Sequence, residues 1–250
     1  MEDNNVTFWN DLYHESQAVV IDEQALVAQQ LNADLSVFAA ICAKRSQWLS
    51  SPAKGVLRLL LERNGGEKTT RATSLVAYQP NSHFAPHLHP LGEEFFVLSG
   101  VFSDEHGDYP AGTYVRNPPE SSHQPFSREG CLIFVKLQQF ALDDSEHKVI
   151  RPEDREVGQA SILFDGYERV SLLTAENTMR FSDWCREQKV VEVAEKGIEL
   201  LVLSGGVLLG GDRYEVGSWL RFATLPDEPL VIQEGAEVWI KMGHLSGGQL

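Results

Sequence analysis

An internal repeat constrains the fold of this 250-residue chain more than any other feature of its sequence. When the sequence is shifted by 105 positions, residues 92–137 align with residues 197–242 without a gap, and 12 of the 46 aligned pairs are identical. The run GEEFFVLSG falls on GIELLVLSG, and YPAGTYVR falls on YEVGSWLR. Self-similarity of this kind marks a structural unit copied within one chain. The sequence therefore predicts two copies of one domain.

Each copy is predicted to consist of β-strands. Short apolar runs such as VLRLLLE, TSLVAY and CLIFVKL are bounded by Gly, Pro, Asn or Ser, which is typical of a β-sandwich or barrel. The charged stretch 141–160 lacks periodicity and is interpreted as a linker. The predicted organisation is an N-terminal extension at 1–48, a first barrel at 49–140 and a second barrel at 161–250.

The N-terminal extension is expected to be partly helical. In residues 24–41 the apolar side chains recur at roughly helical spacing, with Gln30 as the one polar interruption. Asp22 precedes this stretch and could cap such a helix. We expect the extension to pack on the first barrel or to reach a partner subunit.

Charge and cysteine usage limit the partners and the compartment. The chain has 36 acidic and 21 basic residues, a formal net charge of −15, which disfavours binding to nucleic acid or anionic lipid. Its first residues lack a signal-peptide pattern, and no apolar stretch is long enough to span a bilayer. Cys42, Cys131 and Cys185 form no CxxC pair and are expected to be reduced thiols. These features predict a soluble, cytoplasmic protein.

The candidate metal site combines His87, His89, Glu93 and His123. His87 and His89 are two positions apart, so on a strand they project from the same face. A short turn can bring Glu93 back beside them, and His123 follows a proline-rich turn. Taken singly, each residue has a plainer explanation, because a lone His-x-His is more often incidental. Together they suit a borderline divalent ion such as Zn, Fe, Ni, Cu or Mn.

The joint pattern resembles the two signature motifs of the cupin superfamily. The first motif, H-x-H, three residues, E, six residues, G, is matched in full by His87, His89, Glu93 and Gly100. The second motif, G, five residues, P, one residue, G, two residues, H, is matched by Gly112, Pro118 and His123. Glu120 replaces the second glycine of that motif, and this departure affects a turn and no ligand.

The run 93–137 further resembles the cupin domain of ChrR-type proteins, most specifically in DEHGDYPAGTYVRNPP and in SREGC. That family includes zinc-dependent anti-sigma factors that respond to an oxidative signal. The resemblance covers about residues 50–140 and implies a small jelly-roll barrel, or double-stranded β-helix, with the four ligands facing its interior. The predicted fold class is therefore all-β: tandem cupin barrels with a short helical N-terminal extension. One divalent ion per chain is expected, zinc by preference, with Fe, Mn or Ni as alternatives.

Residues 1–50 depart from the anti-sigma factor, which has a separate helical, zinc-binding N-terminal domain. This stretch offers only His14 and Cys42 as ligands of that kind, so anti-sigma activity is not carried over. The predicted function is a regulatory or sensor-like metal-binding cupin. The alternative is a metal-dependent dioxygenase acting on a small dicarbonyl compound; a purely structural site ranks third. A small-molecule ligand or a protein partner is expected, and the resemblance alone implies a homodimer.

The second copy has lost the candidate ligands. Glu93 aligns with Ile198 and His123 with Glu228, and Glu192 and Ala194 fall opposite His87 and His89. A copy that keeps the glycines and the strands but no imidazole has kept the fold and lost the metal. We expect this copy to serve as a scaffold, an interface or a binding module, with Trp184, Trp219 and Trp239 in its core or interface.

Several other residues are assigned structural roles. His83 is interpreted as a residue at the start of a strand rather than as an additional ligand. Glu94 and Arg116 recur in the metal-free copy as Glu199 and Arg221, which favours a buried or rim ion pair over substrate binding.

Two further groups lie closer to the expected site. A solvated hairpin, with a signalling surface as the alternative, is predicted for Asp104, Glu105, His106 and Asp108. Phe95 and Tyr114 are candidates for the apolar wall around the metal.

Overall fold

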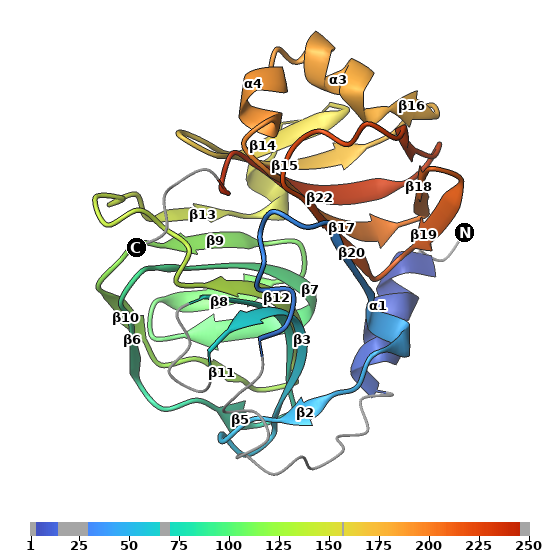
Figure 1. Cartoon of the computed structure of the whole chain (residues 1–250). Coiled ribbons are helices and arrows are strands. Elements are labelled where there is room, and N and C mark those ends of the chain that lie inside the picture. The colour runs from blue at the N-terminus through green and yellow to red at the C-terminus, as the bar shows by residue number, and fades with distance from the viewer. Residues whose placement is uncertain (1–3, 15–29, 66–70, 157, 246–250) are drawn as a thin grey trace. The chain divides into compact units, whose positions relative to one another are not determined.

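The computed structural model describes residues 4–14, 30–65, 71–156 and 158–245 (Figure 1). The chain forms two compact units. The first unit consists of Met1–Ala33 and Ser46–Asp154, and the second of Asp34–Arg45 and Arg155–Leu250. In the part described, no helix is both long and apolar enough to cross a membrane.

Two antiparallel sheets and a two-stranded ribbon build the first unit. The large sheet has the order β13-β9-β7-β12-β4-β3-β2. Its strands are β13 (Lys148–Ile150), β9 (Tyr114–Asn117), β7 (Glu93–Asp104), β12 (Cys131–Leu137), β4 (Arg71–Tyr78), β3 (Val56–Asn64) and β2 (Leu49–Ser50). The far half of β7 continues into a small sheet with β8 (Gly107–Pro110), β11 (Phe126–Ser127) and β5 (Ser82–His83). β6 (His87–His89) and β10 (Ser121–His123) pair as the ribbon, and helix α1 (Asn4–His14) packs against β7 and β12.

The core of the first unit is set by the alternation of side chains along β7. Phe95 and Val97 lie in the core, and after a bulge in the pairing with β12 the alternation changes, so that Phe102 also lies in it. Gly100 at this bend has φ 72°, and a Cβ there would lie 2.2 Å from the carbonyl oxygen of Gly130. Only glycine fits such a position. Each large side chain buried in this core contributes about 1.5–3 kcal/mol.

The second unit repeats this strand order. Its large sheet runs β1-β20-β17-β22-β15-β14, and its small sheet runs β16-β21-β18-β19. The strands are β1 (Ala39–Cys42), β20 (Ser218–Phe222), β17 (Ile198–Ser204), β22 (Glu237–Met242), β15 (Arg169–Thr174), β14 (Ala160–Asp165), β16 (Met179–Arg180), β21 (Leu230–Ile232), β18 (Gly206–Leu209) and β19 (Asp212–Glu215). Helices α3 (Phe181–Glu187) and α4 (Val191–Ala194) lie between β16 and β17 in the chain. In its described part, the second unit has no counterpart of the β6–β10 ribbon.

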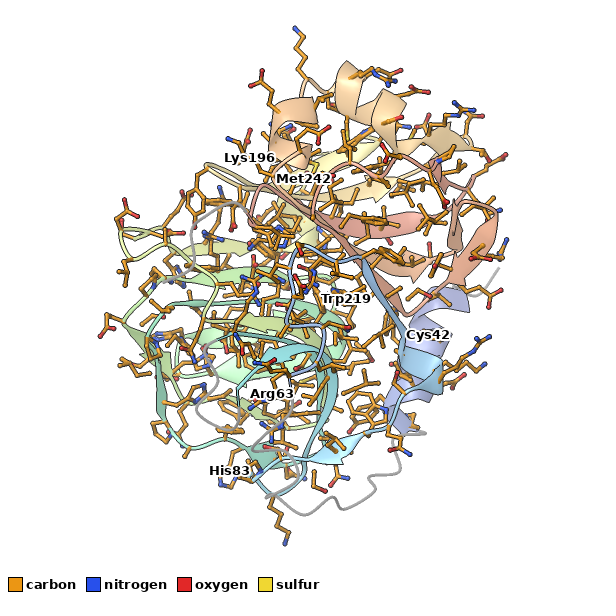
Figure 2. All side chains as sticks on the ribbon, in the orientation of Figure 1. Cys42, Arg63, His83, Lys196, Trp219 and Met242 are labelled. Carbon is orange, nitrogen blue, oxygen red and sulfur yellow. The ribbon has the colours of Figure 1, made fainter. Side chains whose placement is uncertain are left out.

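The face of each large sheet that points away from its core carries the same polar pattern in both units. Glu94 accepts a hydrogen bond from Tyr114 Oη at 2.7 Å, and Glu199 accepts one from Trp219 Nε1 at 2.7 Å (Trp219 is labelled in Figure 2). The prediction that Tyr114 lines the metal is therefore wrong, because Tyr114 is one position out of phase with the core residue Val115.

The repeated arginines are buried, as a structural role requires. Arg116 pairs with Asp144 and lies 3.8 Å from Glu94, whereas Arg221 donates to the backbone oxygen of Asp34 at 2.7 Å. The predicted ion pair of Arg116 is confirmed. Trp184, Trp219 and Trp239 are buried as well.

The helix predicted over 24–41 is wrong in its described part. Residues 24–29 lie outside the described residues, and Ala39–Cys42 form strand β1, which pairs with β20. The ring of Phe38 lies 4.9 Å from that of Phe222, so an apolar pattern that looked helical serves a sheet edge instead. The short helix of the extension is α1.

The stretch interpreted as a linker contains a strand and a short 3-10 turn. β13 adds to the edge of the first large sheet beside β9, and Pro152–Asp154 form the turn. All three residues of β13 are half-buried, so the strand has no alternating pattern that the sequence could have revealed.

Candidate metal centre

The candidate ligands are positioned by the ribbon and by the start of β7. In the ribbon, His123 lies directly opposite His87, and Ser121 lies opposite His89. Because side chains alternate along a strand, the three imidazoles share one face. The turn after His89 is closed by a hydrogen bond from the Gly92 amide to the His89 oxygen at 3.2 Å, and it returns the chain so that Glu93 opens β7.

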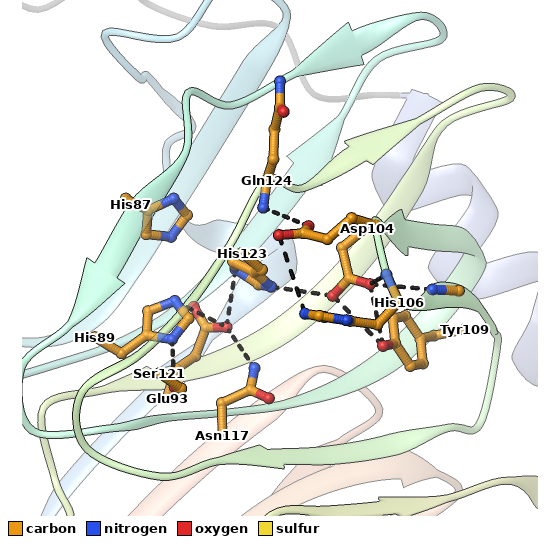
Figure 3. Close-up of polar contacts among 12 residues, drawn as sticks. His87, His89, Glu93, Asp104, His106, Tyr109, Asn117, Ser121, His123 and Gln124 are labelled. Carbon is orange, nitrogen blue, oxygen red and sulfur yellow. Dashed lines mark hydrogen bonds and ion pairs between the residues drawn. The ribbon is translucent and has the colours of Figure 1, made fainter.

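All four candidate ligands converge (Figure 3). One ligand atom from each of His87, His89, Glu93 and His123 lies within 4.8 Å of the others. Glu93 Oε1 is 3.4 Å from His123 Nε2 and 3.7 Å from His89 Nε2. The structure thus brings together the complete set that the sequence predicted.

The outer nitrogen of each imidazole has an oxygen partner. His87 Nδ1 is 3.0 Å from the Ala85 backbone oxygen, and His89 Nδ1 is 3.0 Å from Ser121 Oγ. His123 Nδ1 is 3.2 Å from Asp104 Oδ2. Partners of this kind fix the ring orientation and direct the opposite nitrogen of a metal-binding histidine towards the ion.

The inner nitrogens show that the residues fit a metal ion. Among the described residues, the Nε2 atoms of His89 and His123 are buried and have no hydrogen-bond partner. An unsatisfied buried polar atom costs about 1–3 kcal/mol. A divalent ion would satisfy both atoms at once, together with the carboxylate beside them.

The charges in the cluster also favour a cation. Burial opposes ionisation of Glu93, but the neighbouring His123, His89 and His87 and a 3.4 Å hydrogen bond from Asn117 lower its pKa overall. Burial lowers the pKa of His89, whereas Glu93 and Asp104 raise the pKa of His123 against the effect of its burial. An ionised carboxylate beside a neutral imidazole is the protonation state in which these groups ligate metals.

The four candidate ligands differ in burial. His89, Glu93 and His123 are buried, whereas His87 is half-buried. The ring of Phe84 lies 5.3 Å from His87. An aromatic ring therefore packs beside the most exposed of the four candidate ligands.

An apolar wall lies behind His123. The Phe102 ring is 5.9 Å from the His123 ring and 4.6 Å from the Phe95 ring. Phe95 therefore belongs to this wall, through Phe102.

Three residues outside the predicted ligand set contact the candidate ligands. Ser121 and Asn117 bond His89 and Glu93, and Asp104 was placed in a solvated hairpin. That placement is wrong for Asp104, which is only 7% exposed and contacts His123, but it is correct for Glu105, His106 and Asp108, which are exposed. The repeat contains a pattern that could have identified these residues. In the second copy, which lacks the candidate ligands, Ser121, Asn117 and Asp104 align with Pro226, Phe222 and Leu209.

The second unit fills the corresponding region with apolar side chains. Phe181 and Trp184 of α3 share a core with Ile198 and Phe222, which align with Glu93 and Asn117. The helices α3 and α4 occupy the place in the chain that the β6 ribbon strand holds in the first unit. The second barrel has therefore replaced a polar site with hydrophobic packing.

His83 does not join the cluster. It is exposed in β5, where it pairs with Phe126, as expected of a residue at the start of a strand (Figure 2).

The fold and the site define a class: this is a cupin with a candidate metal centre. Residues 38–141 match the family described as the ChrR cupin-like domain. A search of curated proteins finds no match to the sequence.

Solved structures share the fold over most of the chain. Protein Ylba from E. coli has a TM-score of 0.64 at 13% identity, covering 92% of this chain and 100% of its own. A "putative dioxygenase" from Nostoc punctiforme has a TM-score of 0.60 at 12% identity, covering 85% of each chain. The nickel(II) complex of the bacterial pirin YhhW from E. coli has a TM-score of 0.60 at 11% identity, covering 82% of this chain and 98% of its own. These likenesses show a tandem cupin fold.

Proposed function

We propose that the first cupin domain binds one divalent metal ion, zinc, through His87, His89, Glu93 and His123, and that this ion gives the protein a regulatory, sensor-like role. One observation carries the proposal: buried Nε2 atoms without hydrogen-bond partners among the described residues point at an ionised carboxylate. The match to the ChrR cupin-like family supports the regulatory role. When bound, the ion would act as a Lewis acid towards a small ligand that enters beside His87.

The two buried thiols do not suit a role in sensing oxidants. Cys131 and Cys185 are buried, and burial raises the pKa of each thiol to about 12. Reactive sensor cysteines instead have low pKa values and are accessible. We therefore propose that a signal reaches the protein through the metal or a ligand bound to it rather than through Cys131 or Cys185.

The first test is the metal content of protein purified without added metal or chelator. We expect about one zinc per chain in the wild type, as for a structural or regulatory zinc site, and loss of that zinc in the double variant His87→Ala/His123→Ala. The matched control is His83→Ala, which removes an exposed histidine four positions from His87 and should leave the metal content unchanged. Full metal occupancy in the double variant would disprove the site.

A second candidate function is a metal-dependent dioxygenase acting on a small dicarbonyl compound. The half-exposed His87 favours it, because a substrate needs access to the ion. The fold likeness to the Nostoc punctiforme protein and to a nickel-binding pirin is consistent with it.

Oxygen uptake separates the two candidates. Protein reconstituted with iron(II) is mixed with 2,4-pentanedione, and oxygen consumption is recorded with the His87→Ala/His123→Ala variant as control. Uptake that depends on both the iron and the intact site would establish the enzyme. Isolation with zinc and no uptake with any reconstituted metal would favour the regulatory role.

A further inference from the structure

Asp104 connects the metal centre to the β7–β8 hairpin. Its Oδ1 accepts hydrogen bonds from the backbone amides of His106 at 2.8 Å and Gly107 at 3.2 Å, which closes the turn. Its Oδ2 faces His123 Nδ1 at 3.2 Å. Tyr109 Oη lies 3.2 Å and 3.4 Å from the two oxygens and donates to the carboxylate. One buried carboxylate therefore serves the turn on one side and the candidate ligand on the other (Figure 3).

We propose that Asp104 is a positioning residue of the metal centre, which holds His123 in the tautomer protonated on Nδ1 and so presents the Nε2 lone pair to the ion. This inference rests on the proposed metal binding by the first cupin domain. It assigns to Asp104 a role in metal affinity beyond closing its hairpin turn.

The chemistry of the three outer partners singles out Asp104. The Ala85 partner of His87 is a backbone oxygen, which no side-chain change can alter. The Ser121 hydroxyl can donate or accept, so it fits either tautomer of His89. An ionised carboxylate only accepts. Of the two side-chain partners, Asp104 alone therefore requires its histidine to be protonated on Nδ1.

Charge balance gives Asp104 a second effect. Glu93 and Asp104 are both buried, and Asp104 accepts hydrogen bonds from the His106 amide and from Tyr109 Oη. Two ionised carboxylates carry two negative charges, which the two positive charges of a divalent cation would neutralise. Buried charges are costly unless they are compensated in this way.

The second copy separates the metal-linked residue from the structural one. Tyr109 aligns with Tyr214, so the aromatic ring belongs to the barrel in both units. Asp104 aligns with Leu209, which packs against the apolar core of the unit that has lost the ligands. The carboxylate, unlike the ring, is therefore present only where the histidines are present.

The discriminating variant is Asp104→Asn. If the new amide keeps its oxygen on the turn, its NH2 group faces His123 Nδ1, and that nitrogen must then accept a hydrogen bond. The imidazole proton therefore lies on Nε2, and a protonated Nε2 cannot bind the ion. Removal of such an outer partner typically weakens metal binding about 10–100-fold. We expect a weakening of that size for zinc, measured by competition with a chromogenic chelator.

Two controls distinguish positioning from a loss of the turn. Asp108→Asn changes an exposed carboxylate of the same hairpin, bonded to Ser103 and Arg128, and should leave the zinc affinity unchanged. Long-range 1H–15N spectra of the metal-free proteins at about pH 9, where imidazoles are neutral, report the tautomer of His123 directly. We expect protonation on Nδ1 in the wild type and on Nε2 in Asp104→Asn.

The outcomes separate this inference from the proposed function. Wild-type protein that binds neither zinc, cobalt nor nickel would disprove the metal site itself. Wild-type binding with equal zinc affinity in Asp104→Asn, or with His123 still protonated on Nδ1 in that variant, would overturn the positioning role alone. A lower thermal stability of the metal-free variant, with its zinc affinity intact, would assign Asp104 to the turn only.

Discussion

The candidate ligands differ in how firmly the chain holds them. His89 and His123 are buried and have side-chain partners, whereas His87 is half-buried and bonds only backbone through its Nδ1 in the described structure. The ring of His87 also lies next to that of Phe84. Since ring orientation depends on these contacts, His87 is the ligand with the greatest freedom to adapt when a small molecule approaches the ion.

The buried thiols should resist modification. Thiolate is the reactive form, and a thiol of pKa about 12 is ionised in roughly one molecule in ten thousand at about pH 8. We expect Cys131 and Cys185 to remain unlabelled by iodoacetamide in the native protein at that pH and to be labelled after unfolding, as read by mass spectrometry. Rapid native labelling of either residue would contradict the burial on which the argument depends.

At the level of elements, the turn between β6 and β7 depends on Gly92. This residue has φ 76°, and a Cβ there would lie 2.3 Å from Cδ2 of Phe140. We expect Gly92→Ala to lower the free energy of unfolding by about 2–4 kcal/mol, from backbone strain and overpacking together. It should also weaken metal binding, because Glu93 follows directly.

Chemical denaturation and a zinc titration of Gly92→Ala check this prediction. The control is Gly158→Ala: a Cβ at Gly158 would meet no described atom within 4 Å, so the change should stay within about 0.5 kcal/mol. An equal effect of the two substitutions would show that the turn is not constrained.

Strand periodicity explains what the sequence could predict of the site. His87 and His89 were predictable because a spacing of two places side chains on one face, and Glu93 and His123 because each follows a recognisable turn. Asp104 was not, because it is eleven positions from Glu93 and a regular strand would put it on the opposite face. The bulge near Gly100 reverses the alternation, and pairing with β12 creates that bulge.

Tertiary pairing likewise explains what the sequence could not predict of the fold. The repeat and the turn residues predicted two β-barrels. Residues 39–42 carry an apolar pattern compatible with a helix, and only their pairing with β20, far away in the sequence, makes them a strand. β13 is similar, since it gains its strand identity from β9.

At the scale of the whole molecule, we expect metal binding to stabilise the folded state of the first unit and not that of the second. All four candidate ligands belong to the first unit. A ligand at 100 times its dissociation constant stabilises the folded state by about 2.7 kcal/mol. We expect a chelator to increase amide hydrogen exchange in β6, β7 and β10 of zinc-loaded protein, and to leave β17, β20 and β22 unchanged.

Hydrogen exchange followed by mass spectrometry measures this directly. The His87→Ala/His123→Ala variant serves as the control, because its exchange should not respond to the chelator. An equal response of both units would contradict a metal confined to the first.

The two units differ in the interval of chain that precedes β7 in one and β17 in the other. The same strand framework accepts residues 84–92 in one barrel and residues 181–197 in the other, between equivalent strands. In the first barrel this interval supplies His87 and His89, two of the four candidate ligands, and in the second it supplies the apolar side chains of α3 and α4. One strand framework thus carries polar content in one unit and apolar content in the other at the same interval, and the remaining candidate ligands, Glu93 and His123, come from outside it.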